Sequence, residues 1–395
     1  AYAAALVKDL LAGDACVGIK ARCSGNIIKN VKCVKVPNTD GMIGIETAVL
    51  AGLIGGESSL KMEVISRLTD EHREMIKKAY DMHLCTVEPM VSPIPLHFIL
   101  EAESEHHQVS VEITYKHTHI ERITFDGKEV DLAESSYKAS EPTDRSILSV
   151  EKIYEFAETV RIDDVRELLQ RQIDCNIAIA GEGLKGGYGV AISDLIKDAY
   201  GDGIRARMIA YTAAASEARM EGCALPVVTN SGSGNQGITS SVPVIVYCRE
   251  NGIDEDKMYR ALVLANLLTV HQKTGIGPLS AFCGAMCAAS ASGAAVTYLR
   301  GGNVEAIGRT LSNCYGGAAG MVCDGAKATC AFKIFAALSA SLLSSDMAMN
   351  GLYYTGGTGI IKSDIEDSVK VIGRMAKEGM AETDRKILEL MLEGN

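Results

Sequence analysis

The chain has 395 residues, of which 47% are hydrophobic and 23% charged, and this balance excludes general disorder and allows a large buried core. The net charge of −11 supplies no general attraction for nucleic acid or for an anionic membrane. Aromatic residues make up only 5% and tryptophan is absent, so base-stacking surfaces are not expected.

The first region, to about residue 84, is predicted to be helical with one irregular interruption. Helices are expected over residues 2–11, 42–54 and 60–82. Between the first two, residues 21–38 (ARCSGNIIKNVKCVKVPN) are rich in Asn, Lys and Gly and contain Pro37. This composition predicts irregular structure.

The pattern changes at Cys85, where alternating hydrophobic and polar residues begin. The alternation covers residues 96–103, 108–115 and 119–125, and Asp126-Gly127 marks a turn. Alternation with a period of two predicts an antiparallel sheet, which we expect to end near residue 140.

Helices are predicted again over most of the remaining chain. The stretch from residue 274 to 299 carries no charge, but Pro278 interrupts it and small residues dominate it. We expect a tightly packed core helix there rather than a membrane span. The expected helices cover residues 149–159, 163–172, 191–200, 204–219, 254–269, 279–299, 304–311, 326–344, 364–377 and 383–392.

These elements predict an α+β fold. Residues 1–85 and 145–395 are expected to form one predominantly helical domain, and residues 86–144 a small inserted domain with an antiparallel sheet. We see no internal repeat.

Two segments match the spacing G-x-G-x-x-G, at Gly181–Gly186 and Gly232–Gly237. A dinucleotide site also needs a second parallel strand, which neither segment has. Tight turns at helix ends are the favoured interpretation, with anion binding by backbone N–H groups as an alternative. The second segment is also polar, so it is either a solvated loop or a contact surface for a small zwitterion, through Ser233, Asn235 and Gln236.

Two other kinds of site are weighed and left open. Lys185 or Lys29 could form a Schiff base with pyridoxal phosphate, although spacing selects neither. Histidines of the predicted sheet could chelate a metal, but a solvated sheet surface is favoured for His106, His107, His117 and His119.

The twelve cysteines are the most informative feature of the composition. A long chain without a secretory leader predicts reduced thiols and a cytoplasmic protein. Cys323 and Cys330 are seven positions apart, which is one helix face if the helix is continuous. Such thiols suit a cluster held by three thiolates with one iron left open, and they equally suit plain helix packing. Five of them fall within 48 positions: Cys283, Cys287, Cys314, Cys323 and Cys330.

Five motifs taken together resemble the L-cysteine desulfidase family, which is related to the iron–sulfur L-serine dehydratases. The resemblance covers nearly the whole chain, and no single motif would carry it. The motifs are CSGNIIKN (23–30), VPNTDG (36–41), NSGSGNQG (230–237), KTGIGPLSAFCGA (273–285) and CDGAKATC (323–330).

The resemblance implies an enzyme that converts L-cysteine and water to pyruvate, ammonia and hydrogen sulfide, using a [4Fe-4S] cluster without net redox change. It assigns the cluster to Cys283, Cys323 and Cys330, with Cys287 as an alternative ligand. It makes Cys23 the catalytic base, which requires surroundings that favour the thiolate, for example Lys29.

We further expect polar side chains of two motifs to hold the substrate: Ser24, Asn26, Lys29, Ser233, Asn235 and Gln236. The expected partners are a small amino acid and a second copy of the chain, and neither nucleic acid nor a membrane. An iron–sulfur L-serine dehydratase is the nearest alternative. A pyridoxal-phosphate lyase and a non-enzymatic iron–sulfur or zinc protein are the others.

Overall fold

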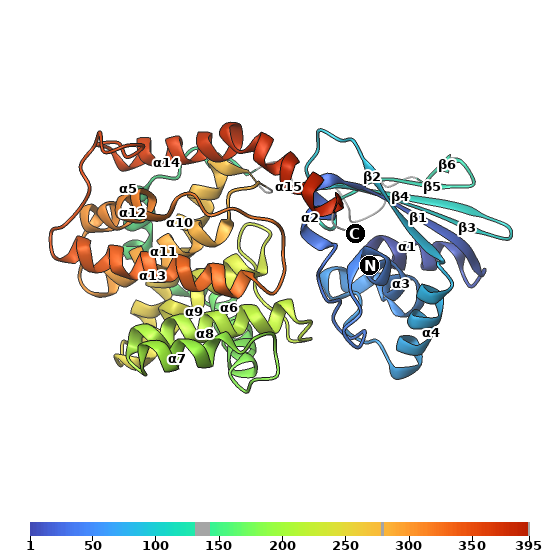
Figure 1. The fold of residues 1–395 in the computed structure, drawn as a ribbon, viewed down its shortest axis with the longest axis horizontal. Coiled ribbons are helices and arrows are strands. Elements are labelled where there is room, and N and C mark those ends of the chain that lie inside the picture. The colour runs from blue at the N-terminus through green and yellow to red at the C-terminus, as the bar shows by residue number, and fades with distance from the viewer. Residues whose placement is uncertain (131–142, 278–279, 394–395) are drawn as a thin grey trace.

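The computed structural model describes residues 1–130, 143–277 and 280–393 of the chain. The protein consists of two parts that lie side by side, each with its own hydrophobic core (Figure 1). We call residues 2–130 the α/β unit and residues 150–379 the helical body. The predicted α+β fold is confirmed.

The α/β unit contains a mixed sheet with the strand order β2-β1-β3-β4-β5-β6. Strands β1 and β2 are parallel, and the other neighbours are antiparallel, as the alternating pattern predicted for the three central hairpin strands. The strands are β1 (Cys16–Ser24), β2 (Cys85–Met90), β3 (His97–Ser104), β4 (Gln108–Thr114), β5 (Ile120–Phe125) and β6 (Lys128–Glu129).

Helices cover one face of this sheet. The helices at residues 2–11 (α1) and 44–55 (α3) pack against the strands. In β1 every second residue is buried, namely Ile19, Ala21 and Cys23. Side chains two positions apart share a sheet face, so Cys23 faces the core of the α/β unit. The helices of this unit are α1 (Tyr2–Leu11), α2 (Gly25–Val31), α3 (Gly44–Gly55), the 3₁₀ helix η1 (Ser58–Glu63) and α4 (Asp70–Asp81).

The residues that share a hydrophobic core differ from those expected to form each domain. Residues 1–85 were expected to join the helical body, but their buried side chains form one core with the sheet. The physical reason is β1, which pairs with both β2 and β3 and so joins the first part of the chain to the sheet, where α1 and α3 pack on its strands. Most of the expected end of the inserted domain, at residues 131–142, lies outside the described residues.

The helical body is built around α11 (Gly284–Leu299), which packs against four other helices. Gly293 allows the closest approach, since a Cβ there would lie 2.1 Å from Ser341 Oγ on α13. The other helices of the body are α5 (Val150–Thr159), α6 (Ile162–Gly183), α7 (Ile192–Tyr200), α8 (Ile204–Met220), α9 (Gly234–Glu250), α10 (Glu255–Ile276), α12 (Val304–Ala318), α13 (Cys330–Met349), α14 (Ile365–Arg374) and the π-helical η2 (Met375–Gly379).

One helix in the described part of the chain, α13, has the length and composition to cross a membrane. It packs against α8, α11 and α12 within the helical body, as the core helix of a globular protein does.

The last helix, α15 (Ala381–Glu393), leaves the helical body and packs on α2 of the α/β unit (Figure 1). Leu388 lies so close to Gly25 that a Cβ on that glycine would be 2.3 Å from its methyl carbon. The α15 helix therefore ties the two parts together beside the CSGN motif.

Candidate active site

Two of the expected ligand cysteines are placed side by side by backbone pairing. The N–H of Cys283 donates to the carbonyl of Met321 (3.0 Å), and the N–H of Cys323 donates to the carbonyl of Ala281 (2.6 Å). These bonds form a short antiparallel bridge between two loops that are far apart in the sequence. The two thiols are hydrogen-bonded to each other.

The third cysteine, Cys330, begins α13 at the end of the loop that starts at Cys323. Its thiol lies near the Gly325 carbonyl (3.6 Å) and affects the pKa of Cys283. Gly325 has a φ of 97°, and a Cβ there would lie 2.0 Å from the carbonyl oxygen of Lys29. A glycine is therefore required where this loop rests on α2. We call Cys283, Cys323 and Cys330 the thiol trio.

The three thiols differ in their protonation. The hydrogen bond to Cys323 and then burial raise the pKa of Cys283 well above its usual value. The same hydrogen bond lowers the pKa of Cys323 to about 6 against the effect of burial, helped by the Gly325 N–H and by the nearby Lys29 and Lys333. Burial raises the pKa of Cys330. The site already stabilises one thiolate, the form that binds iron.

The donor chemistry of the trio fits a [4Fe-4S] cluster. Thiolates are the ligands that such clusters take, and each would bind a different iron. Within residues 1–130, 143–277 and 280–393, no group of three or more Cys, His, Asp or Glu converges as the ligands of a single metal ion do.

Two further cysteines of this region lie within helices α11 and α12. Cys287 is buried one turn into α11, where burial raises its pKa to about 11 against the effect of Lys273. Cys314 is fully buried on α12, where burial raises its pKa to about 12. These two thiols pack in the helical core.

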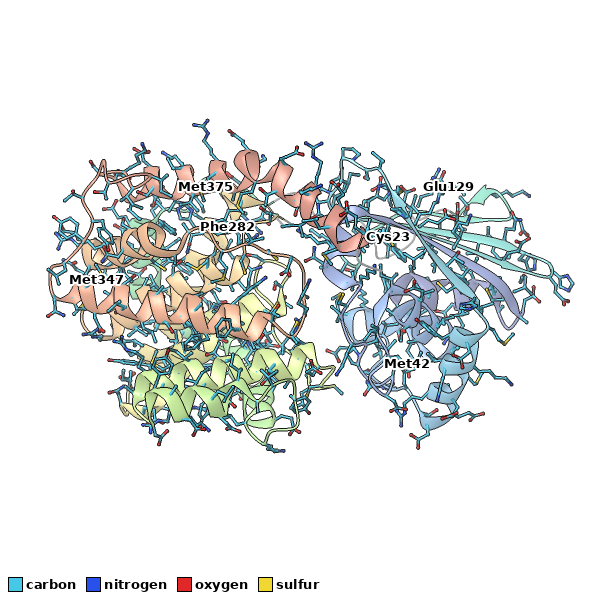
Figure 2. The ribbon with its side chains drawn as sticks, in the orientation of Figure 1. Cys23, Met42, Glu129, Phe282, Met347 and Met375 are labelled. Carbon is cyan, nitrogen blue, oxygen red and sulfur yellow. The ribbon has the colours of Figure 1, made fainter. Side chains whose placement is uncertain are left out.

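Cys23, the residue expected as the base, lies in a different place from the trio. Figure 2 shows it within the α/β unit, apart from Phe282, the neighbour of Cys283 in the helical body. Its side chain is 0% exposed, and burial followed by the proximity of Cys85 raises its pKa to about 12. The expected activation by Lys29 is not seen, because that lysine lies near Cys323 instead.

The other residues of the CSGN segment are divided between structural and site roles. Ser24 donates to the carbonyl of Pro95 (2.7 Å) and accepts from the N–H of His97 (3.4 Å), so its hydroxyl joins α2 to the sheet. Lys29 is buried and forms an ion pair with Asp384 of α15. Asn26 lies one turn from Lys29, and its buried Oδ1 has no hydrogen-bond partner.

The polar loop (residues 229–236) reaches the neighbour of one trio cysteine through a single side chain. Ser233 caps α9 by accepting from the N–H of Gln236 (3.4 Å). The Gln236 side chain lies against Gly284, next to Cys283, and its buried Oε1 has no partner. Asn235 accepts a hydrogen bond from Arg219 (3.3 Å).

Two cations near the trio were missed by the sequence analysis. Lys273 of α10 is buried among the thiols, and burial lowers its pKa against their opposing effect. Arg219 ends α8 and lies close enough to Cys330 to interact with its charge. Lys273 is the first residue of the KTGIGPLSAFCGA motif, so the sequence could have indicated it as a site residue. Arg219 belongs to no motif, so nothing in the local sequence indicated it.

The remaining candidates have structural roles. Lys185 is exposed and pairs with Glu182 (2.5 Å) at the end of α6. Gly183 ends α6 and Gly234 begins α9, so both glycine motifs mark helix ends. The histidines of the sheet mostly pair with acidic neighbours, such as His107 with Asp126 (2.9 Å).

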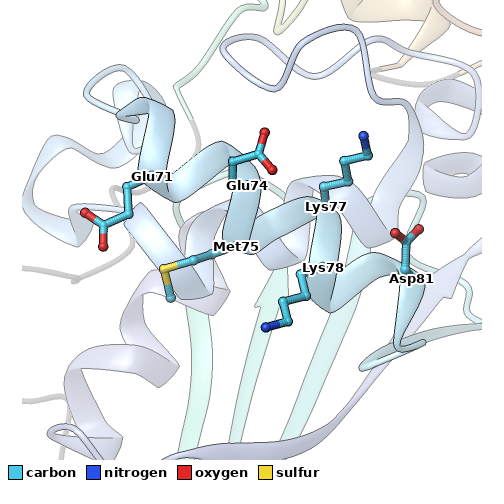
Figure 3. Close-up of a pocket in the computed structure, with 6 residues that line it drawn as sticks. All are labelled: Glu71, Glu74, Met75, Lys77, Lys78 and Asp81. Carbon is cyan, nitrogen blue, oxygen red and sulfur yellow. The ribbon is translucent and has the colours of Figure 1, made fainter.

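Neither of two surface hollows coincides with the trio. One, of about 480 Å³, is lined by charged residues and a methionine of α4 alone (Figure 3). The other, of about 460 Å³, lies between α7 and the start of α13 and has an apolar lining that includes Phe332 and Phe335. An apolar hollow does not suit a zwitterionic amino acid.

The chain is similar to known proteins over nearly its whole length. A UPF0597 protein of Desulfitobacterium hafniense is 44% identical over 99% of this chain and 91% of its own length. Similar proteins of Lachnoclostridium phytofermentans and Finegoldia magna are each 42% identical, over 99% and 100% of this chain and 94% of their own lengths. The profile of the serine dehydratase alpha chain matches residues 59–389, which include the whole trio. The chain therefore belongs to the serine dehydratase alpha chain family.

Proposed function

We propose that the chain is an iron–sulfur-dependent lyase that removes the β-substituent of a small L-amino acid, with L-cysteine as its substrate. In the balanced reaction, L-cysteine and water give pyruvate, ammonia and hydrogen sulfide. Family membership supports the dehydratase-type elimination. The cysteine preference rests on the motif resemblance.

One observation carries the proposal. The hydrogen-bonded thiols of Cys283 and Cys323 lie with Cys330 in one electrostatic environment, which also contains Lys29 and Lys273. Lysines offset the negative charge that gathers when thiolates bind iron in a buried place. A purely structural set of cysteines needs no such cations.

The residues of this chain would divide the work as follows. The trio would hold the [4Fe-4S] cluster, which when bound supplies a Lewis-acidic iron for the sulfur or oxygen on the substrate β-carbon. Gln236 and Asn26 have buried amide oxygens without partners, and these are suited to accept from the substrate ammonium. Ser233 and Asn235 hold the polar loop against α8 and α9.

The base that removes the α-proton is a separate part of the proposal. The resemblance gives this role to Cys23, and we keep that assignment as a prediction. A thiol with a pKa of about 12 is a weak candidate at neutral pH, since the best bases have pKa values near the working pH. Cys23 would need different surroundings when substrate is bound.

L-Serine is the second candidate substrate, because the matching family is named for serine dehydratase. A hydroxyl would then replace the thiol on the β-carbon. The soft thiolate is the better partner for iron held by sulfur ligands, which favours L-cysteine.

The two substrates are separated by one comparison on protein reconstituted with iron and sulfide without oxygen. Sulfide release from L-cysteine and pyruvate release from L-serine are measured side by side. We expect a higher kcat/KM for L-cysteine. A higher value for L-serine would make the chain a serine dehydratase, and no product from either amino acid would reject the proposed function.

The proposal also covers the cell compartment and the binding partners of the enzyme. Reduced thiols and an oxygen-sensitive cluster favour the cytoplasm. A free amino acid is the expected partner, together with a second copy of the chain in a homodimer. A borohydride-trapped lysine adduct would instead indicate pyridoxal phosphate.

A further inference from the structure

Arg219 is unusual among the arginines of this chain. Within the described residues, nearly every arginine forms an ion pair with an acidic side chain, and Arg145, Arg219 and Arg249 do not. Arg145 and Arg249 are exposed to water, whereas Arg219 is partly buried. A guanidinium partly withdrawn from water without an anion loses solvation that neutral hydrogen-bond partners replace only in part.

The guanidinium of Arg219 lies between the polar loop and the trio. Its Nη1 donates to Asn235 Oδ1 (3.3 Å), and a Cβ on Gly234 would lie 2.4 Å from its Nε. Its charge interacts with the Cys330 thiol, and burial lowers its pKa. The same Nη1 also donates to the Met220 sulfur (4.0 Å), and these two neutral acceptors leave most of the five N–H donors available.

A role at the end of α8 alone does not explain this position. A basic residue in the last turn of a helix interacts favourably with the backbone dipole, and Arg249 at the end of α9 does so while exposed. Arg219 turns instead toward Gly234 and Asn235. In this position its free N–H donors can bind an anionic ligand.

We propose that Arg219 binds the α-carboxylate of the amino-acid substrate. The planar guanidinium matches a carboxylate through two parallel hydrogen bonds, which neutral amides cannot offer. This inference rests on the proposed function, because it takes the ligand to be an amino acid.

The surrounding groups complement the rest of such a ligand. Gln236 presents a buried, unpartnered Oε1 beside Gly284, next to Cys283. A carboxylate on Arg219 and an ammonium near Gln236 would place the short side chain of the substrate toward the trio. This arrangement selects small L-amino acids with a free carboxylate and rejects amides and esters.

The test compares Arg219→Met, which removes the charge and keeps much of the length, with Arg219→Lys, which keeps the charge. Arg249→Met is the matched control, an exposed and unpaired arginine at the other end of α9 from Gly234. For each reconstituted protein, iron content, KM for L-cysteine and the binding of L-alanine and L-alaninamide are measured. Alanine has no leaving group, so ligand-observed NMR reports binding without turnover.

We expect Arg219→Met to raise KM and the dissociation constant of L-alanine about 10- to 100-fold, as loss of a charge-assisted hydrogen bond does. Alaninamide binding and iron content should not change, Arg219→Lys should be intermediate, and Arg249→Met should match the unmodified chain.

Equal losses for alanine and alaninamide, a loss of iron, or no preference of the unmodified chain for the carboxylate would overturn the role of Arg219. Carboxylate binding that depends on Arg219 in a protein that turns over neither cysteine nor serine would uphold this role and reject the proposed function.

Discussion

The two parts of the molecule each bury several cysteine thiols, and the surroundings shift the pKa values of these thiols differently. In the α/β unit, Cys23 and Cys85 lie on neighbouring strands of the sheet, and burial raises the pKa of each to about 12. In the helical body, the thiol trio is also largely buried and the pKa values of Cys283 and Cys330 are raised, but the pKa of Cys323 falls to about 6.

The difference lies in what accompanies the sulfur atoms. The pair is surrounded by hydrocarbon and by Glu46, whose charge opposes ionisation. The trio has a donated hydrogen bond, a backbone N–H and several lysines nearby. Burial alone therefore does not prepare a thiol to bind metal, because the surroundings must also stabilise the thiolate.

The largest expected effect comes from removing a member of the trio. Cys323→Ser should lose the cluster and lower activity at least about 1,000-fold, because a hydroxyl is a poor ligand for iron. Iron and sulfide content and lyase rate are measured together. Cys85→Ser, the control in the α/β unit, should keep both, and a full cluster in Cys323→Ser would refute the ligand assignment.

The next effect concerns thiol reactivity as a function of pH. A thiol with a pKa of about 12 is ionised to roughly one part in 10,000 at pH 8, so Cys23 should resist iodoacetamide in the folded protein. Its ionised fraction rises about tenfold per pH unit below the pKa, so any labelling should increase with pH. Exposed Cys33 serves as the internal reference in mass spectrometry. Equal labelling of Cys23 and Cys33 at pH 8 would contradict the raised pKa of Cys23.

A moderate effect is expected on stability at the junction of the two parts. Lys29→Met leaves Asp384 beside a buried apolar side chain, and breaking such a pair costs about 3 kcal/mol of unfolding free energy. Chemical denaturation measures the loss. Adding Asp384→Leu should restore part of it, and full stability in Lys29→Met alone would show that the ion pair does not fasten α15 to α2.

The smallest effect on stability is expected for Cys23→Ala. Its thiol lies in the core of the α/β unit, so we expect an intact cluster and a loss of roughly 1 kcal/mol in stability. Because the resemblance makes Cys23 the base, turnover should nevertheless fall at least about 100-fold, and turnover within about tenfold of normal would reject Cys23 as the base.

The sequence predicted local structure well where the pattern was strong. The alternating runs became β3, β4 and β5, and nearly all the helices after residue 149 were expected close to their positions. Strand β1 was missed although Ile19, Ala21 and Cys23 alternate with polar residues, because the second half of that pattern was taken for irregular structure. Helix α9 was missed because its first turns are polar and Pro243 lies inside it.

The candidate site was harder to predict, because its parts come from distant segments. The trio was grouped from motifs, and the structure shows the backbone pairing that joins Cys283 to Cys323. Arg219 lies 111 positions before Cys330 and belongs to no motif, so only the packing of α8 beside α9 and α13 reveals it. The same holds for Lys29, whose partner Asp384 comes from the last helix.

Iron and sulfide analysis with an ultraviolet–visible spectrum, on protein purified and reconstituted without oxygen, tests the central claim most directly. The account predicts about four irons and four sulfides per chain, with visible absorption that disappears in a variant in which Cys283, Cys323 and Cys330 are all serine. The same iron content and spectrum in that triple variant would contradict it.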